Sequence, residues 1–263
     1  MVKKILVLGH KGMLGNVVVK YFTTQENYEV LTTDTRWGHE LFKEALKNTE
    51  ASFIVNCIGA IPQKKFIDDT FTTINFDLPV FLETLNKRII HPTTDCEFSG
   101  NIPLKQQYAV TDERDATDAY GKSKADISLL IEKSFKNTKM IRTSIIGHEL
   151  ASHVSLLDWF LSEEGEVSGY TDHYWNGVTT LQWAKLCDAL MTSWDNTPTL
   201  NQFSSPEILS KYEILTIVKK IYNKDINIRP TTTGKVINKC LTSQEATPLL
   251  QDQLEELRNF YGK

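Results

Sequence analysis

A glycine turn near the N-terminus constrains the fold more than any other feature of this sequence. Residues 4–8 form an apolar run, and Gly9, Gly12 and Gly15 follow it at intervals of three. A second, largely apolar stretch covers residues 14–22 and includes the last of these glycines. Glycine is needed where a chain turns sharply and where its backbone must come close to another group. The pattern therefore predicts a strand over 4–8, a tight turn and a helix over 14–22.

Short apolar runs and longer amphipathic stretches then alternate along the chain. A strand predicted over residues 28–33 closes a β-α-β unit, which requires parallel strands and a right-handed crossover. This regular alternation predicts an α/β fold, a Rossmann-type doubly wound parallel sheet with a smaller C-terminal lobe. Further predicted strands are 51–57, 88–92 and 139–146, and further predicted helices are 41–48, 70–86 (broken or capped near Pro79) and 118–135.

The glycine turn has the chemistry of a pyrophosphate-binding loop. A G-x-x-G-x-x-G sequence between a strand and a helix lets the backbone approach a pyrophosphate. The N-terminus of the helix adds unpaired N–H groups and a partial positive charge. The fold and the turn together predict NAD or NADP as the cofactor, with contacts from Gly9, Lys11, Gly12, Met13 and Leu14.

Asp34 and Arg36 bear on which of the two cofactors is bound. Asp34 ends the second predicted strand, about 20 residues beyond the turn, where an acidic residue accepts hydrogen bonds from the adenosine ribose of NAD. Arg36 follows two residues later and could pair with the 2′-phosphate of NADP. The sequence leaves the choice between NAD and NADP open.

Three residues have the chemistry of carbonyl reduction. Tyr120 and Lys124 lie four residues apart in the predicted helix 118–135 and therefore share one face. An unperturbed tyrosine has a pKa of about 10, and a nearby ammonium lowers that pKa by stabilising the phenolate. Thr94 follows the predicted strand 88–92, at the sheet edge where open α/β folds bind ligands. We expect Tyr120 to protonate the substrate oxygen, Lys124 to support Tyr120 and hold the nicotinamide ribose, and Thr94 to hydrogen-bond the same substrate oxygen.

The regular alternation ends near residue 147, and this suggests how the chain is divided. We expect residues 1–147 to form an NAD(P)-binding Rossmann domain, with 179–195 packing back on it. Residues 148–178 and 196–263 are expected to form a small substrate-binding lobe. The elements predicted in the later part are helices over 156–161, 182–194, 210–222 and 249–261 and an extended piece over 226–229.

Composition and charge exclude several other classes of protein. The chain has 263 residues, a net charge of −4 and dispersed cations, so binding to nucleic acid or to an anionic membrane is not expected. No apolar stretch reaches the roughly 18 residues that a membrane-spanning helix needs, and the first apolar run is too short for a signal peptide. The four cysteines and six histidines show no ligand spacing, so we expect free thiols, no metal site and a cytoplasmic location.

Several motifs together resemble the extended short-chain dehydrogenase/reductase superfamily, and within it the dTDP-4-dehydrorhamnose reductase-like branch of sugar-nucleotide enzymes. The glycine turn, the segment 93–100 and Tyr-Gly-Lys-Ser-Lys at 120–124 carry this resemblance. It spans nearly the whole chain and is closer before residue 147 than after it. The other matching segments are 56–60, Asn75 with Pro79, 142–144, 170–172, 177–179, 204–206 and 210–212.

The resemblance implies further cofactor contacts and a substrate. The strand end and turn that contact the cofactor in this family correspond to Cys57, Ile58 and Gly59, and Asn75 belongs to its N-x-x-x-P helix. Thr143 corresponds to the end of the strand beneath the nicotinamide. The implied substrate is a nucleotide-activated deoxysugar, and the implied reaction is reduction of its 4-keto group.

The chain also departs from the family pattern. Related 4,6-dehydratases carry glutamate directly after Thr-Asp, but here Thr94 and Asp95 are followed by Cys96, and Glu97 comes one place too late. Dehydration is therefore disfavoured. Val178 stands where the family usually has proline, so the substrate-side loop departs from the family pattern. The chain is also short for an epimerase of this superfamily.

Two alternatives remain at this stage. One is a sugar-nucleotide epimerase that retains tightly bound NAD. The other is a non-catalytic nucleotide-binding subunit, since this branch also resembles a regulatory subunit of methionine adenosyltransferase, although Thr94, Tyr120 and Lys124 together favour an enzyme. The sugar, the nucleotide and the formation of a homodimer stay open. Side chains of the lobe that are candidates for substrate contact, but that more often pack, are His148, His153, Trp159, His173, Tyr174 and Trp175.

Overall fold

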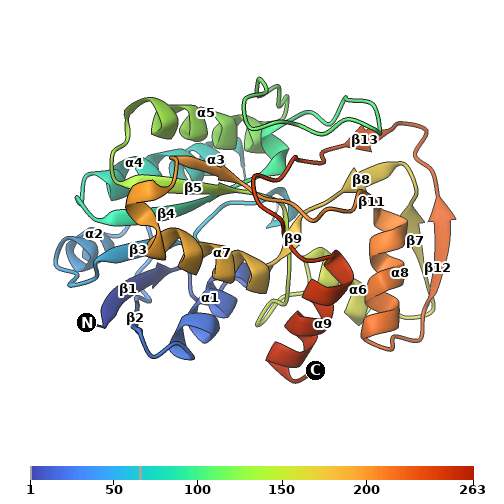
Figure 1. Ribbon diagram of the computed structural model, residues 1–263, viewed down its shortest axis with the longest axis horizontal. Helices are drawn as coiled ribbons and strands as arrows, with labels where there is room; N and C mark the ends of the chain where they lie inside the picture. The colour runs from blue at the N-terminus through green and yellow to red at the C-terminus, as the bar shows by residue number, and fades with distance from the viewer. Residues whose placement is uncertain (1, 65–66) are drawn as a thin grey trace. The chain divides into compact units, whose positions relative to one another are not determined.

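A six-stranded sheet organises the computed structural model, which describes residues 2–64 and 67–263 (Figure 1). Its strands lie in the order β10-β5-β4-β3-β1-β2, and the pairs β1/β2, β1/β3 and β3/β4 are parallel. The predicted Rossmann-type fold is thereby confirmed. The strands are β1 (Lys3–Leu8), β2 (Tyr28–Thr32), β3 (Phe53–Asn56), β4 (Arg88–Thr93), β5 (Thr138–Arg142) and β10 (Leu200–Gln202).

The strand order reverses at β1. Ile5 pairs in register with Val30 of β2 on one side and with Phe53 of β3 on the other. The chain therefore first builds the sheet towards β2 and then returns past β1 to extend it through β3. In open α/β sheets such a reversal leaves a crevice at the carboxyl ends of the strands. The glycine turn follows β1 directly, so it lies at this reversal.

The two faces of β1 pack against different helices. Leu6 and Leu8 belong to a core that includes residues of α2 (Glu40–Lys47), α4 (Leu78–Glu83), β3 and β4. Because side chains alternate along a strand, Ile5 and Val7 face the other way, and both are fully buried. Figure 1 shows α1 (Met13–Thr23) on one side of the sheet and α4 with α5 (Ala119–Ser134) on the other. A strand covered on both faces explains the uninterrupted apolar run.

The helix predicted over 70–86 is broken as expected near Pro79. Its pieces are α3 (Asp68–Phe71), a π-helical turn (Thr72–Asp77) and α4. Proline has no N–H to donate to the carbonyl four residues earlier, which is that of Asn75. The wider turn accommodates this missing bond, and π-helical turns of this kind often occur at functional sites.

The strand predicted over residues 139–146 is wrong as a single element. The chain forms β5, leaves it at Thr143 and Ser144, and then forms β6 (Ile145–Ile146), which pairs in parallel with β9 (Val178–Thr179) in a separate two-stranded sheet. The carbonyl of Ser144 accepts the N–H of Val178 at 2.9 Å. This long-range bond, which has no local sequence signal, turns the chain from one sheet into the other.

The later part of the chain forms short strands and four further α-helices among its described residues. β8 (His173–Trp175) lies between β11 (Leu209–Ser210) and β13 (Ile237–Asn238), and β7 (Glu166–Tyr170) pairs with β12 (Asn227–Thr231). Of these strands, the sequence predicted only the extended piece at β12. The helices are α6 (Leu156–Ser162), α7 (Thr180–Thr192), α8 (Lys211–Ile221) and α9 (Leu250–Tyr261), and all four were predicted.

The chain forms two compact units. The first unit comprises residues 1–93, 117–141 and 184–201, and the second comprises 94–116, 142–183 and 202–263. The predicted domain boundaries (1–147 with 179–195, against 148–178 and 196–263) differ from these mainly at 94–116. That segment is tied to the second unit because Glu97 pairs with Arg142 and Tyr108 exchanges backbone bonds with residues 240 and 242. The functional assignment of the two predicted parts stays a prediction.

The helices, the candidate metal ligands and the cysteines can be described for residues 2–64 and 67–263. No helix there combines the length and the apolar surface needed to cross a membrane. Within the same ranges, no cluster of three His, Cys, Asp or Glu side chains is arranged to hold a metal ion. The four cysteines, Cys57, Cys96, Cys187 and Cys240, are all unbridged thiols.

Candidate active site

The glycine turn leads from β1 into α1. Gly9 has a φ of +72°, and a Cβ added there would lie 2.9 Å from the backbone of Cys57. A Cβ on Gly15 would lie 2.1 Å from the carbonyl oxygen of Gly9, so neither position accepts a side chain. Gly12 donates its N–H to Gly9 at 2.9 Å, and α1 then begins at Met13 without a capping side chain. The backbone N–H groups of the first turn are therefore suited to hold an anionic group.

Lys11 and Asp34 meet across the end of this turn. Asp34 lies two residues beyond β2, and its Oδ1 is 2.5 Å from Lys11 Nζ and 3.4 Å from His10 Nε2. The hydrogen bond from Lys11 lowers the pKa of Asp34 below its ordinary value. Arg36 is exposed in the same loop. The structure thus brings Lys11, a predicted cofactor contact, next to Asp34, which was predicted to influence the choice between NAD and NADP.

The turn after β3 lies beside the glycine turn. The N–H of Cys57 donates to the carbonyl of Leu8 at 3.0 Å, which joins the ends of β3 and β1. Burial raises the pKa of the Cys57 thiol, so this cysteine stays protonated at neutral pH. Ile58 and Gly59 continue the turn. These three residues, matched to the cofactor-contacting turn by resemblance, therefore lie next to the predicted pyrophosphate loop.

Asn75 anchors that turn from the π-helical segment. The side chain is 2% exposed and makes a two-way bond with the backbone of Ala60, accepting at 2.9 Å and donating at 3.1 Å. Its second N–H donates to Ser123 Oγ on α5 at 3.2 Å. Both amide hydrogens are thereby used inside the protein. Asn75 links the turn after β3 to α5, and its predicted contact with the cofactor stays a prediction.

Tyr120 and Lys124 lie one turn apart on α5. Asp118 caps the N-terminus of this helix, because its side chain accepts the backbone N–H of Gly121 at 2.8 Å. The ring of Phe71 contacts Tyr120 edge-on at 5.8 Å between centroids. Lys124 is only 6% exposed, and its Nζ donates to the carbonyl of Pro92 in β4 at 2.7 Å. A lysine is seldom buried to this extent without a specific partner. The structure thus holds the ammonium at a defined place beside the end of the sheet.

Asn56 and His91 form a buried polar pair that the sequence did not predict. The amide oxygen of Asn56 accepts the N–H of Ile58 at 3.1 Å, so its nitrogen faces His91 Nδ1, 3.1 Å away. His91 is 1% exposed, and its Nε2 has no hydrogen-bond partner among the described residues. Burial, and then the charge of Lys124, lower the pKa of His91, so its ring is neutral. The sequence offered one signal for this pair, which is that Asn56 and His91 are polar residues within the otherwise apolar strands β3 and β4.

Thr94 and Thr143 belong to the second unit, whereas the other predicted site residues belong to the first. Thr94 is 9% exposed; its hydroxyl donates to Asp95 at 2.9 Å and accepts the N–H of Cys96 at 3.1 Å. Thr143 is 2% exposed, and its hydroxyl donates to the carbonyl of Ser144 at 3.2 Å. The roles of both threonines towards substrate and cofactor stay predictions.

Glu97 forms a buried ion network directly after Thr94. Its Oε2 lies 2.7 Å from Arg114 Nε and 2.7 Å from an Arg142 guanidinium nitrogen, and Glu97 and Arg142 are both fully buried. Arg142 also donates to Gln202 Oε1 at 3.0 Å. In the sequence, Glu97 was noted only because it lies one place beyond the position of the glutamate that related dehydratases use. Its partners are 17 and 45 residues away, so no local pattern could reveal the network.

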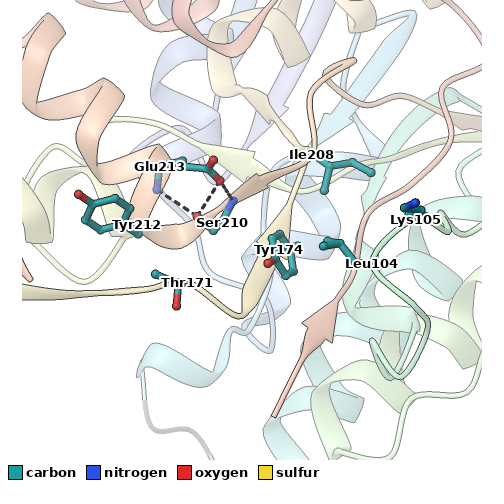
Figure 2. Close-up of a pocket in the computed structure, with 8 residues that line it drawn as sticks. All are labelled: Leu104, Lys105, Thr171, Tyr174, Ile208, Ser210, Tyr212 and Glu213. Atoms are coloured by element: carbon teal, nitrogen blue, oxygen red, sulfur yellow. Dashed lines mark hydrogen bonds between the residues drawn. The ribbon is translucent and has the colours of Figure 1, made fainter. Parts of the chain in front are cut away.

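The second unit contains a pocket of about 560 Å³ (Figure 2). Glu213 accepts both the backbone N–H and the hydroxyl of Ser210 at 2.7 Å, which caps α8. Those polar groups are therefore engaged with each other, and the aromatic and apolar residues mainly give the pocket its shape. A pocket of this size suits a small organic ligand. The lining residues are Leu104, Lys105, Thr171, Tyr174, Ile208, Ser210, Tyr212 and Glu213.

Among the lobe candidates from the sequence, Tyr174 lines this pocket, whereas His148 and Trp175 are packing residues. His148 is 1% exposed, with Nδ1 2.6 Å from Asp158 and Nε2 2.9 Å from the hydroxyl of Tyr222. Trp175 is 5% exposed. These two side chains stabilise the second unit rather than offering a free polar group to a ligand.

The sheet order and the glycine turn at its reversal define a Rossmann-type α/β protein. A family model described as the RmlD substrate binding domain matches residues 3–257, and the chain belongs to this family. The resemblance to the dTDP-4-dehydrorhamnose reductase-like branch of the extended short-chain dehydrogenase/reductase superfamily is thereby confirmed. A comparison with curated protein sequences finds no match.

Solved structures share this fold over their whole length. A dTDP-4-dehydrorhamnose reductase from Clostridium acetobutylicum is 18% identical with a TM-score of 0.79, covering 99% of this chain and 100% of its own. The dTDP-4-dehydrorhamnose reductase from Bacillus anthracis, in complex with NADP, is 16% identical with a TM-score of 0.83, covering 100% of both chains. A UDP-glucose 4-epimerase from Thermotoga maritima, with UDP-glucose, is 13% identical with a TM-score of 0.79, covering 98% of both.

Proposed function

We propose that this chain reduces the 4-keto group of a nucleotide-activated deoxysugar with NADH or NADPH. The observation that carries the proposal is the buried Lys124, whose ammonium is fixed 2.7 Å from the carbonyl of Pro92 and one helical turn from Tyr120. Burying a charged group is unfavourable unless a partner or a function compensates for it. A fixed ammonium near a tyrosine is what a phenol needs to act as an acid near neutral pH.

The first unit fits a nicotinamide dinucleotide. Gly9 and Gly15 leave no room for side chains, which suits close approach of a pyrophosphate to the backbone. Asp34 would accept hydrogen bonds from the adenosine ribose, and Lys11 or Arg36 would face a 2′-phosphate if one is present. The NADP in the Bacillus anthracis relative supports this class of cofactor. The residues of the first unit proposed to hold it are Gly9, Lys11, Gly12, Met13, Leu14, Asp34, Arg36, Cys57, Ile58, Gly59, Asn75, Tyr120 and Lys124, and Thr143 of the second unit is also proposed as a contact.

Tyr120 is the proposed proton donor. When bound, the reduced cofactor supplies hydride to the carbonyl carbon. Tyr120 gives its phenolic proton to the oxygen as negative charge develops there, and Lys124 stabilises the phenolate that remains. A donor held ready at a developing oxyanion is worth about 3 kcal/mol in mutational studies. Thr94 is proposed to orient that oxygen through its hydroxyl.

Replacing the phenol alone tests this mechanism. Tyr120→Phe should lower kcat by at least about 100-fold, because general acid catalysis contributes a factor of that size or more. Fluorescence titration should give the same Kd for NADPH and NADH as in the wild type. Tyr261→Phe, on α9 in the second unit, is the matched control and should retain wild-type turnover. Unchanged turnover in Tyr120→Phe would refute the assignment.

The same assays separate the two alternative functions. dTDP-4-dehydrorhamnose is the first substrate to test, because the reductase relatives bear its name; UDP-linked 4-keto sugars follow. An epimerase would be purified with NAD already bound and would turn over without added cofactor. A regulatory subunit would bind the cofactor and reduce none of the sugars.

A further inference from the structure

The carbonyl of Pro92, which accepts from the Lys124 ammonium, points from β4 towards β3. Ile89 donates its N–H to Asn137, just before β5, at 2.8 Å. Because the backbone groups of successive strand residues point to opposite sides, those of Ile90 and Pro92 face β3. A strand carbonyl in this position ordinarily accepts a backbone N–H of the neighbouring strand.

The N–H that would complete this pairing is taken by a side chain. From the register of β3 and β4, the next backbone bond of a parallel ladder would run from Ile58 to Pro92. Instead, Ile58 donates its N–H to the amide oxygen of Asn56 at 3.1 Å. The ladder therefore stops one bond early, and the Pro92 carbonyl is left for the ammonium of Lys124, 2.7 Å away.

His91 decides which way the Asn56 amide faces. The amide nitrogen lies 3.1 Å from His91 Nδ1, and since this nitrogen can only donate, Nδ1 is the acceptor and the proton of the neutral ring is on Nε2. Burial, and then the charge of Lys124, hold the pKa of His91 well below its usual value, so Nδ1 stays unprotonated. A donor at Nδ1 would turn the amide oxygen towards His91 and leave Ile58 facing the amide nitrogen, to which an N–H cannot donate.

The histidine is unfavourable for stability at this position. His91 is 1% exposed, and its Nε2 has no hydrogen-bond partner among the described residues. A buried N–H without an acceptor lowers stability, and such a group in a native protein calls for an explanation. An apolar residue would suit a strand that is covered on both faces, so packing does not account for a histidine there.

We propose that His91 is a positioning residue for Lys124. By accepting from Asn56, it keeps the amide oxygen on Ile58, and this reserves the Pro92 carbonyl for the ammonium. All of these residues belong to the first unit. The inference rests on the proposed function in one respect, because the fixed ammonium matters there for the acidity of the phenol one helical turn away on α5.

Titration of Tyr120 in the free protein tests this inference without a substrate. The phenolate absorbance of each protein, minus that of the same protein carrying Tyr120→Phe, gives the titration midpoint of this tyrosine alone. His91→Phe keeps a ring but removes the acceptor, so Ile58 can turn to Pro92 and displace the ammonium. The midpoint should rise by about one pH unit, the lower end of the effect that a nearby opposite charge has on an acid. The alkaline limb of kcat/KM for dTDP-4-dehydrorhamnose should move upward with it.

A conservative variant and a control separate positioning from folding. His91→Asn places an amide oxygen near the position of Nδ1 and should bring the midpoint back close to that of the wild type. Ser128→Ala removes a 3.0 Å bond to Thr93 that also joins α5 to β4, and it should leave the midpoint unchanged. If His91→Phe does not fold, Asn56→Leu removes the amide that engages Ile58 and should raise the midpoint by the same amount.

The outcomes for the inference and for the proposed function are distinguishable. A midpoint that stays at the wild-type value in His91→Phe (or, failing that variant, in Asn56→Leu) overturns the inference alone. An equal rise in Ser128→Ala also overturns it, because any weakening of the contact between α5 and β4 would then have the same effect. A wild type that reduces none of the 4-keto sugars, while the rise in the midpoint is present, overturns the proposed function and leaves the positioning of Lys124 by His91 standing.

Discussion

At the scale of single residues, the pair formed by Lys11 and Asp34 has a consequence for cofactor choice. Asp34 alone would repel the 2′-phosphate of NADPH, and Lys11 Nζ, 2.5 Å from its carboxylate, offsets that charge. We therefore expect Lys11→Ala to raise the ratio of Kd for NADPH to Kd for NADH by about fivefold at low ionic strength, since the charges are exposed and screened by salt. Fluorescence titration with each nucleotide measures this ratio.

Lys20→Ala is the matched control, because Lys20 is an exposed lysine of α1 beyond the glycine turn. It should leave the ratio unchanged. Asp34→Ala should shift the ratio the opposite way, in favour of NADPH. An equal effect of Lys11→Ala on both nucleotides would mean that Lys11 binds the pyrophosphate they share and does not act through the 2′ position.

Glu97 gives the second prediction at this scale. Its carboxylate is fully buried between Arg114 and Arg142, and removing one partner of a buried ion pair leaves the other charge uncompensated. Glu97→Gln should therefore lower the free energy of unfolding by about 3 kcal/mol. Urea unfolding followed by circular dichroism measures it. Glu113→Gln, at an exposed position, should change the free energy of unfolding by much less than 1 kcal/mol, and an equal loss in both variants would contradict the role of the network.

Sequence reasoning found residues whose chemistry is local and missed those whose partners are distant. The spacing of Tyr120 and Lys124 follows from one helix, so it could be predicted. The pairing of Asn56 with His91 spans two strands, and its signal is only a polar residue within each apolar run. Asp95 was treated as part of a family motif, because its bond to Thr94 depends on a turn that only the structure shows.

At the scale of elements, long periodic segments were predicted well and short strands were not. The three helices of the second unit occur close to their predicted bounds, since each has an apolar face of helical period. β6, β9, β11 and β13 have two residues each, too few for any alternation to appear. Their positions depend on pairing with distant segments, such as β6 with β9, and local propensity cannot decide such pairings.

The loop after β12 gives a prediction about pH. Asp172 Oδ2 accepts from the hydroxyl and N–H of Thr233, the hydroxyl of Thr232 and the N–H of Gly234. Burial alone would raise the pKa of Asp172, but the bonds from Thr232 and Thr233 lower it to about 2. A carboxyl whose folded pKa is depressed stabilises the fold above its unfolded pKa of about 3.9. That stabilisation is lost as pH falls through 3.9 towards about 2.

Asp172→Asn tests this by comparison with the wild type. The difference in urea midpoint between the two proteins should be constant from pH 7 to about pH 5 and should shrink as the pH is lowered further, because protonation removes the same charge in the wild type. Asp252→Asn, a substitution in the first turn of α9, is the control. A difference that stays constant down to pH 3 would show that the Asp172 charge does not hold the loop.

At the scale of the whole molecule, the family model and the solved structures match this chain over nearly its whole length although the sequence identity to those structures is low. The family model covers residues 3–257, and the solved relatives match over 98–100% of this chain at 13–18% identity. The prediction of the fold from this chain rested on its glycine turn, its alternation of strands and helices, and its Tyr-x-x-x-Lys spacing. These features follow from backbone geometry and from one local spacing, so a single sequence could reveal them. The resemblance in sequence was looser after residue 147, and the assignment of a substrate to that part of the chain stays a prediction.

The two compact units share secondary structure, and this leads to a last prediction. β5 crosses the unit boundary between residues 141 and 142, α7 between 183 and 184, and β10 between 201 and 202. Boundaries between independent domains usually fall in exposed linkers, so elements that continue across a boundary favour cooperative unfolding. We therefore expect one calorimetric transition. NADPH at 100 times its Kd should stabilise the whole chain by about 2.7 kcal/mol and move that transition upward as one peak.

Gly15→Ala isolates the contribution of the cofactor. A Cβ there would lie 2.1 Å from the Gly9 carbonyl oxygen, so the turn must shift and the upward displacement by NADPH should disappear. Gly165→Ala is the control for adding a methyl group, because Gly165 has a positive φ of +72° but open space where its Cβ would lie; it should lose stability slightly and keep the response. Two transitions, of which NADPH moves only one, would show that the units unfold independently despite the three elements they share.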